Sequence, residues 1–299
     1  MENFILIIGA ICIGYVLNRL NIFPKEAPNI LNKFVIYISL PAMILLQIPR
    51  LTFSFDVLIP IVIAWTVMIL TAIFILFISK TLNFNKEITG SLLLVGILGN
   101  TSFLGIPILN AYFGEHSLPY VIVYDQIGTF IALATFGTFV ASYYSSKGEV
   151  SFRIITLKVL TFPPFLSLLF ALFFIGTKFP DTVTSVLSSF ANTIVPIALV
   201  AVGLQLKLKL PREELKPFGV ALFTKLLLAP ALAYFICYTF SWNNQIAQIS
   251  IMEAGMGPMI TAGAVASMAG LAPRLSSAIV GYGIIFAFLT TGVLFKLIT

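Results

Sequence analysis

Three ionisable side chains, Glu253, Asp125 and Lys225, fall inside long apolar stretches of this chain. A carboxylate at the centre of a bilayer costs about 2.5–3.5 kcal/mol on insertion scales, and such residues commonly mark ion or proton paths. Lys225 stands about 15 Å deep in its run, too far for its stem to carry the ammonium easily to the interface. We therefore expect ion coupling. The structural alternatives are static ion pairs or protonated, hydrogen-bonded carboxyls, and snorkelling for Lys225.

The spacing around Asp125 indicates what those groups would bind. Asp125 and Thr129 are four residues apart, which places them on one face of a helix. Together with Asn100, Thr101 and Glu253 they would form an all-oxygen cage, which suits a hard cation such as Na⁺. A buried carboxyl that holds a proton would suit H⁺ instead. The residues leave both coupling ions open.

Glu253 also opens a stretch that an ordinary membrane helix avoids, because Gly255, Gly257 and Pro258 follow it. A proline inside a helix costs about 3 kcal/mol and a glycine about 1 kcal/mol. Such a helix is stable at mid-membrane only if its freed backbone groups face protein or a water-filled cavity. The stretch therefore predicts a helix that is broken inside the membrane.

A second stretch, 96–107, has the same character, and Gly99 and Gly105 align with Gly257 and Gly263 at one common offset. Two interrupted spans at matching positions indicate the binding site of a secondary transporter. The helix N-termini at the breaks favour a bound anion. The alternative for Asn100 is an amide that caps the broken backbone. We expect the anion to contact Asn100, Thr101, Ser102, Pro107, Gly257 and Pro258.

The elements that must position these residues are membrane helices. The 299 residues are 59% hydrophobic and only 9% charged, whereas a soluble domain carries about 25% charged residues. The apolar runs are continuous rather than alternating, which excludes a β-barrel. Runs of about 20 apolar residues predict ten spanning helices. They are 3–20, 29–48, 57–79, 88–112, 118–143, 154–176, 182–205, 216–239, 245–270 and 275–297.

The basic residues predict the orientation. Most Lys and Arg residues fall in alternate connections, and only Arg50, Lys178 and Lys296 fall on the opposite side. The positive-inside rule then predicts that both termini lie on the outer side of the cell membrane. Because the basic residues sit in short loops, the net charge of +6 does not indicate nucleic-acid binding.

The two halves of the chain repeat. Pro41 and Pro196 align at nearly the same offset as the glycines. Five spans per half is an odd number, so the second half must enter the membrane inverted. The sequence thus predicts an all-α membrane protein of ten transmembrane helices in two inverted five-helix repeats, in which broken helices four and nine cross. The predicted parts are a first repeat over 1–143, a cytoplasmic linker over 144–153 and a second repeat over 154–299.

Three segments resemble the auxin efflux carrier family, in the form of its prokaryotic members. They are the Asn-Thr…Gly-Ile-Pro run over 100–107, the Tyr-Asp-Gln-Ile-Gly-Thr run over 124–129 and the Glu-Ala-Gly-Met-Gly-Pro run over 253–258. The resemblance implies the fold of bile acid:sodium symporters and sodium/proton antiporters. Helices 1, 2, 6 and 7 would form a scaffold and homodimer interface, and helices 3–5 and 8–10 a core that moves as an elevator. It also implies a malate-, malonate- or auxin-like carboxylate as substrate.

The resemblance bears on coupling as well. The run Glu253-Ala254-Gly255-Met256 resembles the Glu-x-Gly-Met run whose glutamate helps hold sodium in the bile acid symporters, although Gly257-Pro258 replaces the Gln-Asn that follows there. Asp125 with Lys225 resembles the Asp/Lys pairing of some sodium/proton antiporters, which favours a proton-linked or ion-independent mechanism.

Other function classes find little support. One histidine and two cysteines are too few for the usual zinc site. The sequence has no Gly-x-Ser-x-Gly protease motif and no nucleotide-binding Gly-x-x-x-x-Gly-Lys run. We expect a carrier of a small organic anion in the lipid membrane, without a cofactor beyond Na⁺ or H⁺, and not an enzyme. The alternatives are a coupled symporter or antiporter of another solute, or a channel, which would need an open file of ligands.

Overall fold

The computed structural model describes residues 2–24, 26–51, 55–145, 160–206 and 214–299. In these ranges every named element is a helix, and an isolated antiparallel bridge pairs Gly99 with Pro258. Several predictions fall outside the described residues. They are most of the 144–153 linker, the start of the 154–176 run, and the basic residues Lys25, Lys147, Arg153, Lys158, Lys207, Lys209 and Arg212.

The described helices confirm an all-α, multi-pass membrane protein. Six helices are long and apolar enough to cross a membrane, and three shorter apolar helices accompany them. The six match predicted runs. They are Ala27–Arg50, Phe55–Thr81, Glu115–Tyr144, Asp181–Gln205, Leu215–Thr239 and Pro273–Ile298. The count of ten, the inverted repeats and the division into scaffold and core stay predictions.

The chain divides into two compact units. Unit 1 comprises Met1–Phe55, Ser102–Ile122 and Leu157–Leu206. Its helices, together with short 3-10 and π-helical (η) turns, come from three separate parts of the sequence. They are α1 (Glu2–Arg19), α2 (Ala27–Phe34), η1 (Val35–Ser39), α3 (Leu40–Gln47), η2 (Ile48–Arg50), α6 (Ile106–Phe113), η5 (Glu115–Ser117), α7 (Leu118–Val123), α10 (Pro163–Leu172), α11 (Asp181–Ala191) and α12 (Ile194–Gln205).

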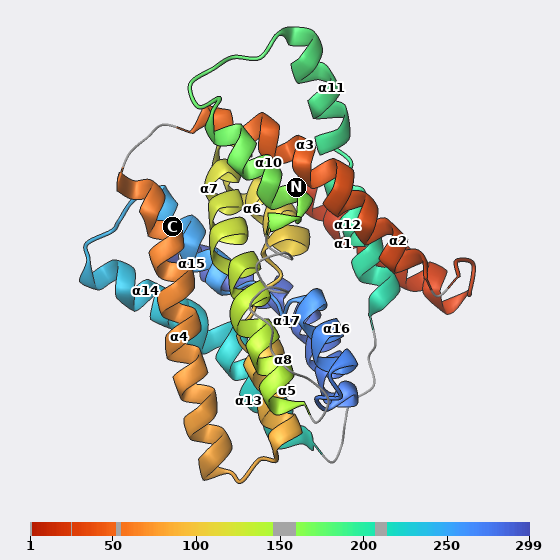
Figure 1. Cartoon of the computed structure of the whole chain (residues 1–299), viewed down its shortest axis with the longest axis vertical. Coiled ribbons are helices and arrows are strands. Elements are labelled where there is room, and N and C mark those ends of the chain that lie inside the picture. Colours follow the sequence, from red (N-terminus) through yellow and green to blue (C-terminus); the bar gives the residue numbers. More distant parts are fainter. Residues whose placement is uncertain (1, 25, 52–54, 146–159, 207–213) are drawn as a thin grey trace. The chain divides into compact units, whose positions relative to one another are not determined.

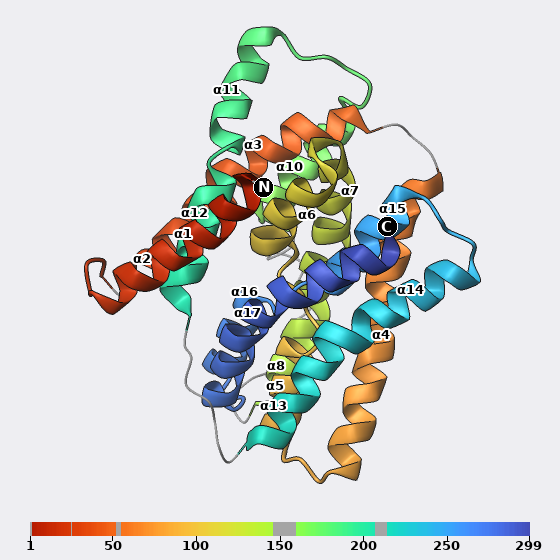
Figure 2. The same ribbon diagram turned by 180° about the vertical axis from the view of Figure 1, so that it is seen from behind.

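Within unit 1, α1 packs lengthwise against α12 (Figures 1 and 2). Two glycines make this close approach possible. A Cβ atom at Gly14 would collide with the carbonyl oxygen of Val200, and one at Gly203 would collide with the carbonyl oxygen of Ile11. The hydroxyl groups of Ser39 and Thr193 lie 2.6 Å apart and join η1 to the residue that precedes α12.

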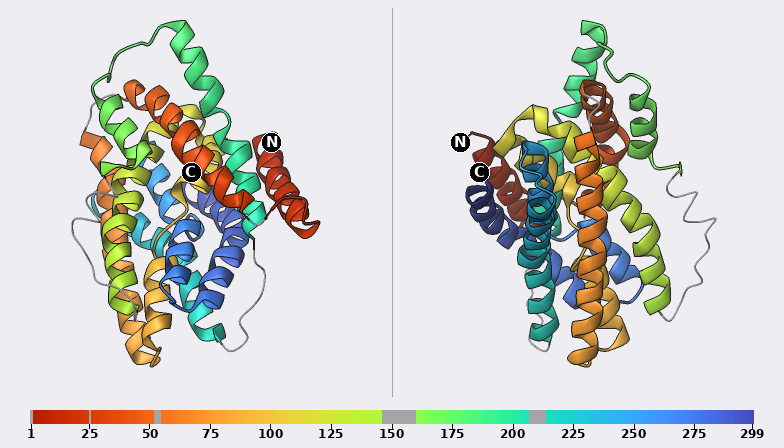
Figure 3. Two further views of the ribbon diagram at one scale, coloured as in Figure 1. Left: turned by 45° about the vertical axis from the view of Figure 1, so that its right-hand side comes forward. Right: turned by 90° about the vertical axis from the view of Figure 1, so that its left-hand side faces the viewer.

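Unit 2 comprises Asp56–Thr101, Val123–Thr156 and Lys207–Thr299. The long α4 runs beside the helix that α13, η9 and α14 form (Figure 3). Buried apolar side chains of these elements pack into two clusters, one of them around Ile75 and Leu92 and the other around Ile63 and Ala233. The elements of unit 2 are α4 (Leu58–Thr81), α5 (Lys86–Val95), η6 (Tyr124–Phe130), η7 (Leu133–Gly137), α8 (Thr138–Tyr144), α13 (Leu215–Phe223), η9 (Thr224–Leu228), α14 (Ala229–Thr239), α15 (Gln245–Ala254), α16 (Ile260–Met268) and α17 (Pro273–Ile298). The segment η4 (Thr101–Gly105) begins with the unit 2 residue Thr101 and continues into unit 1.

Two half-helices of unit 2, α5 and α15, are built alike. Each has ten residues, and each begins after an asparagine whose side chain accepts a hydrogen bond from a backbone N–H of the first turn. Asn85 accepts from Ile88 at 2.8 Å, and Asn244 accepts from Ala247 at 3.0 Å. Each half-helix ends at a glycine, Gly96 or Gly255. Asparagine is a strong N-cap because its oxygen satisfies an N–H that has no partner within the helix.

Candidate functional site

The two stretches that the sequence marked as helix breaks meet inside unit 2. The residues between α5 and η4 pair antiparallel with those between α15 and α16. The backbone N–H of Asn100 donates to the carbonyl of Gly257 at 2.8 Å, and the N–H of Met259 donates to the carbonyl of Leu98 at 2.9 Å. These bonds satisfy backbone groups that the broken helices no longer pair, which apolar surroundings require.

The residue types at this crossing follow from the packing. Pro258 has no N–H, so it fits at a break where no helical hydrogen bond is needed. Helix α17 approaches it so closely that a Cβ at Gly283 would lie 2.5 Å from Pro258 Cδ. A Cβ at Gly257 would lie 3.1 Å from the Cβ of Ala287. The glycine-proline pattern that predicted the break therefore also permits a close approach of neighbouring backbone.

Residues from three π-helical segments gather beside this crossing. Thr101 begins η4, Asp125 and Thr129 lie in η6, and Lys225 lies in η9. A π-helical turn shifts the hydrogen-bond register by one residue and often occurs at functional sites. The indole nitrogen of Trp65 donates to the carbonyl of Ile127 at 3.1 Å, within η6. Polar residues in these segments were recognised from the sequence, but residue types alone do not indicate a π-helical hydrogen-bond register, so the π-helical turns themselves were not predicted.

Asp125 is buried and holds two hydrogen bonds from side chains. The hydroxyl group of Thr101 donates to Oδ1 at 2.5 Å, and the amide of Gln126 donates to Oδ2 at 2.6 Å. Both oxygens of the Asp125 side chain therefore accept a hydrogen bond. Gln126 was not among the predicted site residues, although it lies in the 124–129 run that carries the family resemblance.

Glu253 is in a different situation. Its side chain is fully buried, at 0% exposure, and neither carboxylate oxygen has a hydrogen-bond partner among the described residues. Asp125 and Lys225 both act on it electrostatically. Within the described chain, no ion pair of 4.0 Å or less joins Glu253 to Lys225. A buried polar group without a hydrogen-bond partner is costly, which makes Glu253 a candidate functional residue.

Lys225 lies at 3% exposure, and its ammonium remains inside the unit. Nζ donates to the carbonyl of Ala254, the last residue of α15, at 2.8 Å. The ammonium occupies space that a side chain at Gly99 would need, because a Cβ there would lie 3.1 Å from Nζ. The lysine thus contacts both broken segments.

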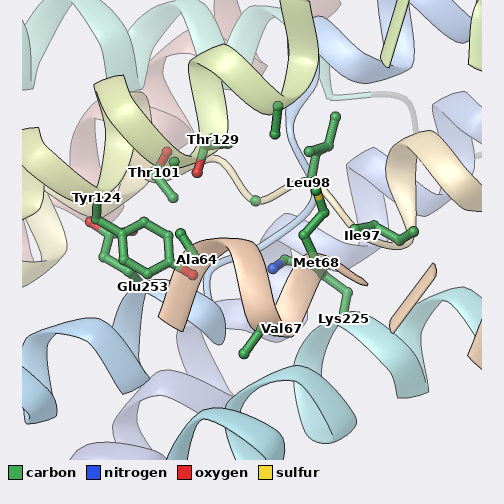
Figure 4. A pocket seen from close by; sticks show the side chains of 13 residues that line it. Ala64, Val67, Met68, Ile97, Leu98, Thr101, Tyr124, Thr129, Lys225 and Glu253 are labelled. Atoms are coloured by element: carbon green, nitrogen blue, oxygen red, sulfur yellow. The ribbon is translucent and has the colours of Figure 1, made fainter. Parts of the chain in front are cut away.

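One pocket of unit 2 is lined by Thr101, Tyr124, Thr129, Lys225 and Glu253. Thr101 and Thr129 lie next to each other in it (Figure 4). Its volume is about 20 Å³. A cavity of roughly 10–15 Å³ by this measure holds a single water molecule. We call it the ion-sized pocket, because it has room for a small ion, a proton or one water and none for an organic anion.

The structure gathers most of the predicted site residues here. Asn100, Gly257 and Pro258 form the backbone crossing next to the ion-sized pocket, and Asp125 joins it through Thr101. Ser102 and Pro107 belong to unit 1 instead. Pro107 lines a larger cavity there. Tyr124 was missed by the sequence reasoning, since nothing in an apolar run distinguishes a pocket-lining tyrosine from a packing one.

The amino-acid sequence is similar to those of known membrane transport proteins. The profile of a family described as membrane transport protein matches residues 1–295. A protein of Methanocaldococcus jannaschii described as an uncharacterized transporter is 27% identical over 265 residues, which cover 86% of this chain and 85% of that protein. An uncharacterized transporter of Methanothermobacter thermautotrophicus is 26% identical over 262 residues, or 85% of this chain and 84% of that protein.

Proposed function

This chain belongs to the membrane transport protein family, the family of the auxin efflux carriers, and on that premise we propose that it is a secondary carrier of a small organic anion. Family membership makes it a transporter and not an enzyme. The substrate class, the coupling and the elevator-type alternating access form the proposal. A carboxylate such as malate, malonate or an auxin-like acid is the expected solute.

The observation that carries the proposal is the paired crossing of two broken segments beside three buried ionisable residues. Gly99 and Pro258 pair between half-helices, and Asp125, Lys225 and Glu253 are each at most 3% exposed. Intramembrane ionisable groups of this kind mark ion and proton paths. A channel needs polar groups along its whole length, whereas these residues form one compact cluster.

The likeness of α5 and α15 supports the inverted-repeat arrangement. Both half-helices start at an asparagine cap, run for ten residues and end at a glycine before the crossing. Transporters built from inverted repeats bind substrate and coupling ions where such discontinuous helices meet. On this proposal two five-helix repeats surround the site, and a core of helices 3–5 and 8–10 moves against a dimeric scaffold of helices 1, 2, 6 and 7.

For the coupled ion we propose H⁺ rather than Na⁺. The oxygens of Glu253, Thr101 and Thr129 are ligands that Na⁺ accepts, but the Lys225 ammonium lines the same pocket of about 20 Å³. A protonated Lys225 repels a second cation in so small a pocket, whereas its ammonium can exchange a proton with a carboxylate. Glu253, which has no hydrogen-bond partner among the described residues, is the proposed proton carrier.

The test is uptake of labelled malate, malonate and indole-acetate into proteoliposomes under an imposed pH gradient or an imposed Na⁺ gradient. Uptake driven by the pH gradient, and lost in Glu253→Gln, is expected. Glu87→Gln is the matched control, because Glu87 is an exposed glutamate at the start of α5 and should keep wild-type uptake.

Other outcomes would change the proposal in distinct ways. Uptake driven only by Na⁺ would replace the proton by sodium at Glu253, Thr101 and Thr129. Uptake that depends on neither gradient would mean that the protein is a uniporter and that its buried charges are structural. If no carboxylate enters the vesicles while the protein remains folded, the substrate class is wrong.

A further inference from the structure

A second and much larger cavity lies wholly within unit 1. It has a volume of about 350 Å³ and is lined by residues of α1, α3, α6, α11 and α12. Pockets that bind small molecules occupy roughly 300–1,000 Å³. The ion-sized pocket of unit 2 measures about 20 Å³, so of these two cavities the one in unit 1 is large enough for a small organic solute.

The polar groups of this cavity centre on Arg50. Its Nη1 lies 3.4 Å from the side-chain oxygen of Gln47, which is 2% exposed, and 3.8 Å from a carboxylate oxygen of Glu115. Asn110 and Ser188 add neutral hydrogen-bonding groups to the lining. A guanidinium beside amides and hydroxyls is an arrangement suited to recognising a carboxylate.

The ion pair between Arg50 and Glu115 is loose. The two side chains are 50% and 72% exposed, and a single 3.8 Å contact is longer than a charge-assisted hydrogen bond. Exposed pairs of this kind contribute little to stability. Glu115 can therefore turn into solvent and leave Arg50 to another carboxylate, which a guanidinium can hold through two parallel hydrogen bonds.

We propose that this cavity is a second binding site, in which Arg50 holds the carboxylate of a small organic acid and Glu115 is the built-in competitor that the ligand displaces. Apolar side chains such as Ile7, Met43 and Leu46 share the lining, so the preferred ligand carries a short apolar body. Arg50 ends one apolar span and Glu115 begins another, at the membrane side that the basic-residue pattern predicts to face the cell exterior. The site would take up the acid on that side.

This inference rests on the solute class of the proposed function but not on the coupling residues, and a protection experiment tests it directly. In a Cys12→Ser, Cys237→Ser background, Asn192→Cys places a reporter thiol on the lining, where residue 192 is exposed. The rate of maleimide modification is measured on purified protein in detergent with added malate, malonate or indole-acetate.

We expect at least one of these acids to slow the modification, and its neutral amide to have no effect. Arg50→Gln should raise the half-protecting concentration about tenfold or more, because a hydrogen bond to a charged group is worth at least one factor of ten. Glu115→Gln should lower it by up to about fivefold, since the competing ion pair is weak. Lys178→Gln, which removes an exposed charge elsewhere in unit 1, should leave protection unchanged.

The outcomes separate this site from the proposed function. Protection that persists in Glu253→Gln protein, which has lost uptake, would support a site independent of the coupling residues. If Arg50→Gln does not change the protection, or if an acid is taken up but gives no protection in folded protein, the inference is wrong. The proposed carrier function would still stand. The absence of both protection and uptake would overturn the two together.

Discussion

The ammonium of Lys225 occupies the space that a side chain at Gly99 would fill. A Cβ atom at Gly99 would lie 3.1 Å from Nζ and 3.2 Å from Cε, while Nζ itself donates to Ala254 at 2.8 Å. One glycine of the first broken segment thus leaves room for the lysine that contacts the second. Gly99, Lys225 and Ala254, which are far apart in the sequence, thus lie next to one another.

Substitution Gly99→Ala should therefore impair transport without unfolding the protein. The new methyl group meets the far end of a flexible side chain, so the lysine moves and its hydrogen bond to Ala254 weakens. Because a hydrogen bond from a charged group contributes about 1.5–3 kcal/mol, uptake should fall roughly tenfold or more. Proteoliposome uptake and the Tm in detergent measure the two effects. Gly219→Ala is the matched control, as no atom lies within 4 Å of its added Cβ.

Lys225 and Glu253 should show a non-additive effect on stability. Lys225→Met leaves the buried Glu253 carboxylate without its nearby cation, and adding Glu253→Gln removes that stranded charge. The double variant should therefore be more stable than Lys225→Met alone, with a coupling of about 1–3 kcal/mol. Thermal unfolding of the four proteins of the cycle measures this coupling.

The exposed neighbours Lys86 and Glu87 offer a matched control for that cycle. Lys86→Met combined with Glu87→Gln should be additive within about 0.5 kcal/mol, because surface charges interact weakly. If the buried pair is equally additive, the electrostatic coupling between Glu253 and Lys225 does not contribute to the folded state.

Thr101 should be required for its hydroxyl group rather than for its size. Thr101→Val keeps the shape but removes the donor to Asp125, a bond to a charged group worth about 1.5–3 kcal/mol. Uptake should fall roughly tenfold or more in Thr101→Val and remain within about threefold of wild type in Thr101→Ser. Equal loss in both variants would mean that packing and not the hydrogen bond is decisive.

The contact between α1 and α12 should be intolerant of any side chain at Gly14. An added Cβ would collide with the Val200 carbonyl and lie 3.0 Å from Gly203 Cα, and backbone atoms cannot turn aside. Gly14→Ala should destabilise the protein by about 1–3 kcal/mol, as overpacked cores do. Gly9→Ala, on the same helix with no atom within 4 Å, should leave the Tm unchanged or slightly raised. Thermal unfolding in detergent compares the two, and equal Tm values would contradict the close approach.

The two asparagine caps should be equivalent, as expected for repeated elements. Asn85→Ala and Asn244→Ala each remove an acceptor for a first-turn N–H and should each cost about 0.5–2 kcal/mol. Asn→Asp at either position keeps the acceptor and should cost little. Thermal unfolding provides the comparison, and a loss at one cap alone would argue that the half-helices are not equivalent.

Much of this protein was determined by its sequence alone, because the relevant physics is local. Continuous apolar runs require helices in a membrane, and glycine with proline at Gly257 and Pro258 breaks one wherever it occurs. Buried ionisable residues were recognisable for the same reason, since Glu253 and Lys225 are costly in any apolar run. The family resemblance came from runs that combine these same features.

Only the tertiary structure decided which of these residues meet and which do not. Contacts between distant segments have no signature in residue type. They decide that Gly99 pairs with Pro258, that Thr101 donates to Asp125 and that Glu253 has no hydrogen-bond partner among the described residues. Pro107 shared a motif with Asn100 and Thr101 yet lines a different cavity, because the chain passes from one unit to the other within that motif. The sizes of the two cavities likewise depend on how side chains from many helices pack, and no single stretch of sequence records that.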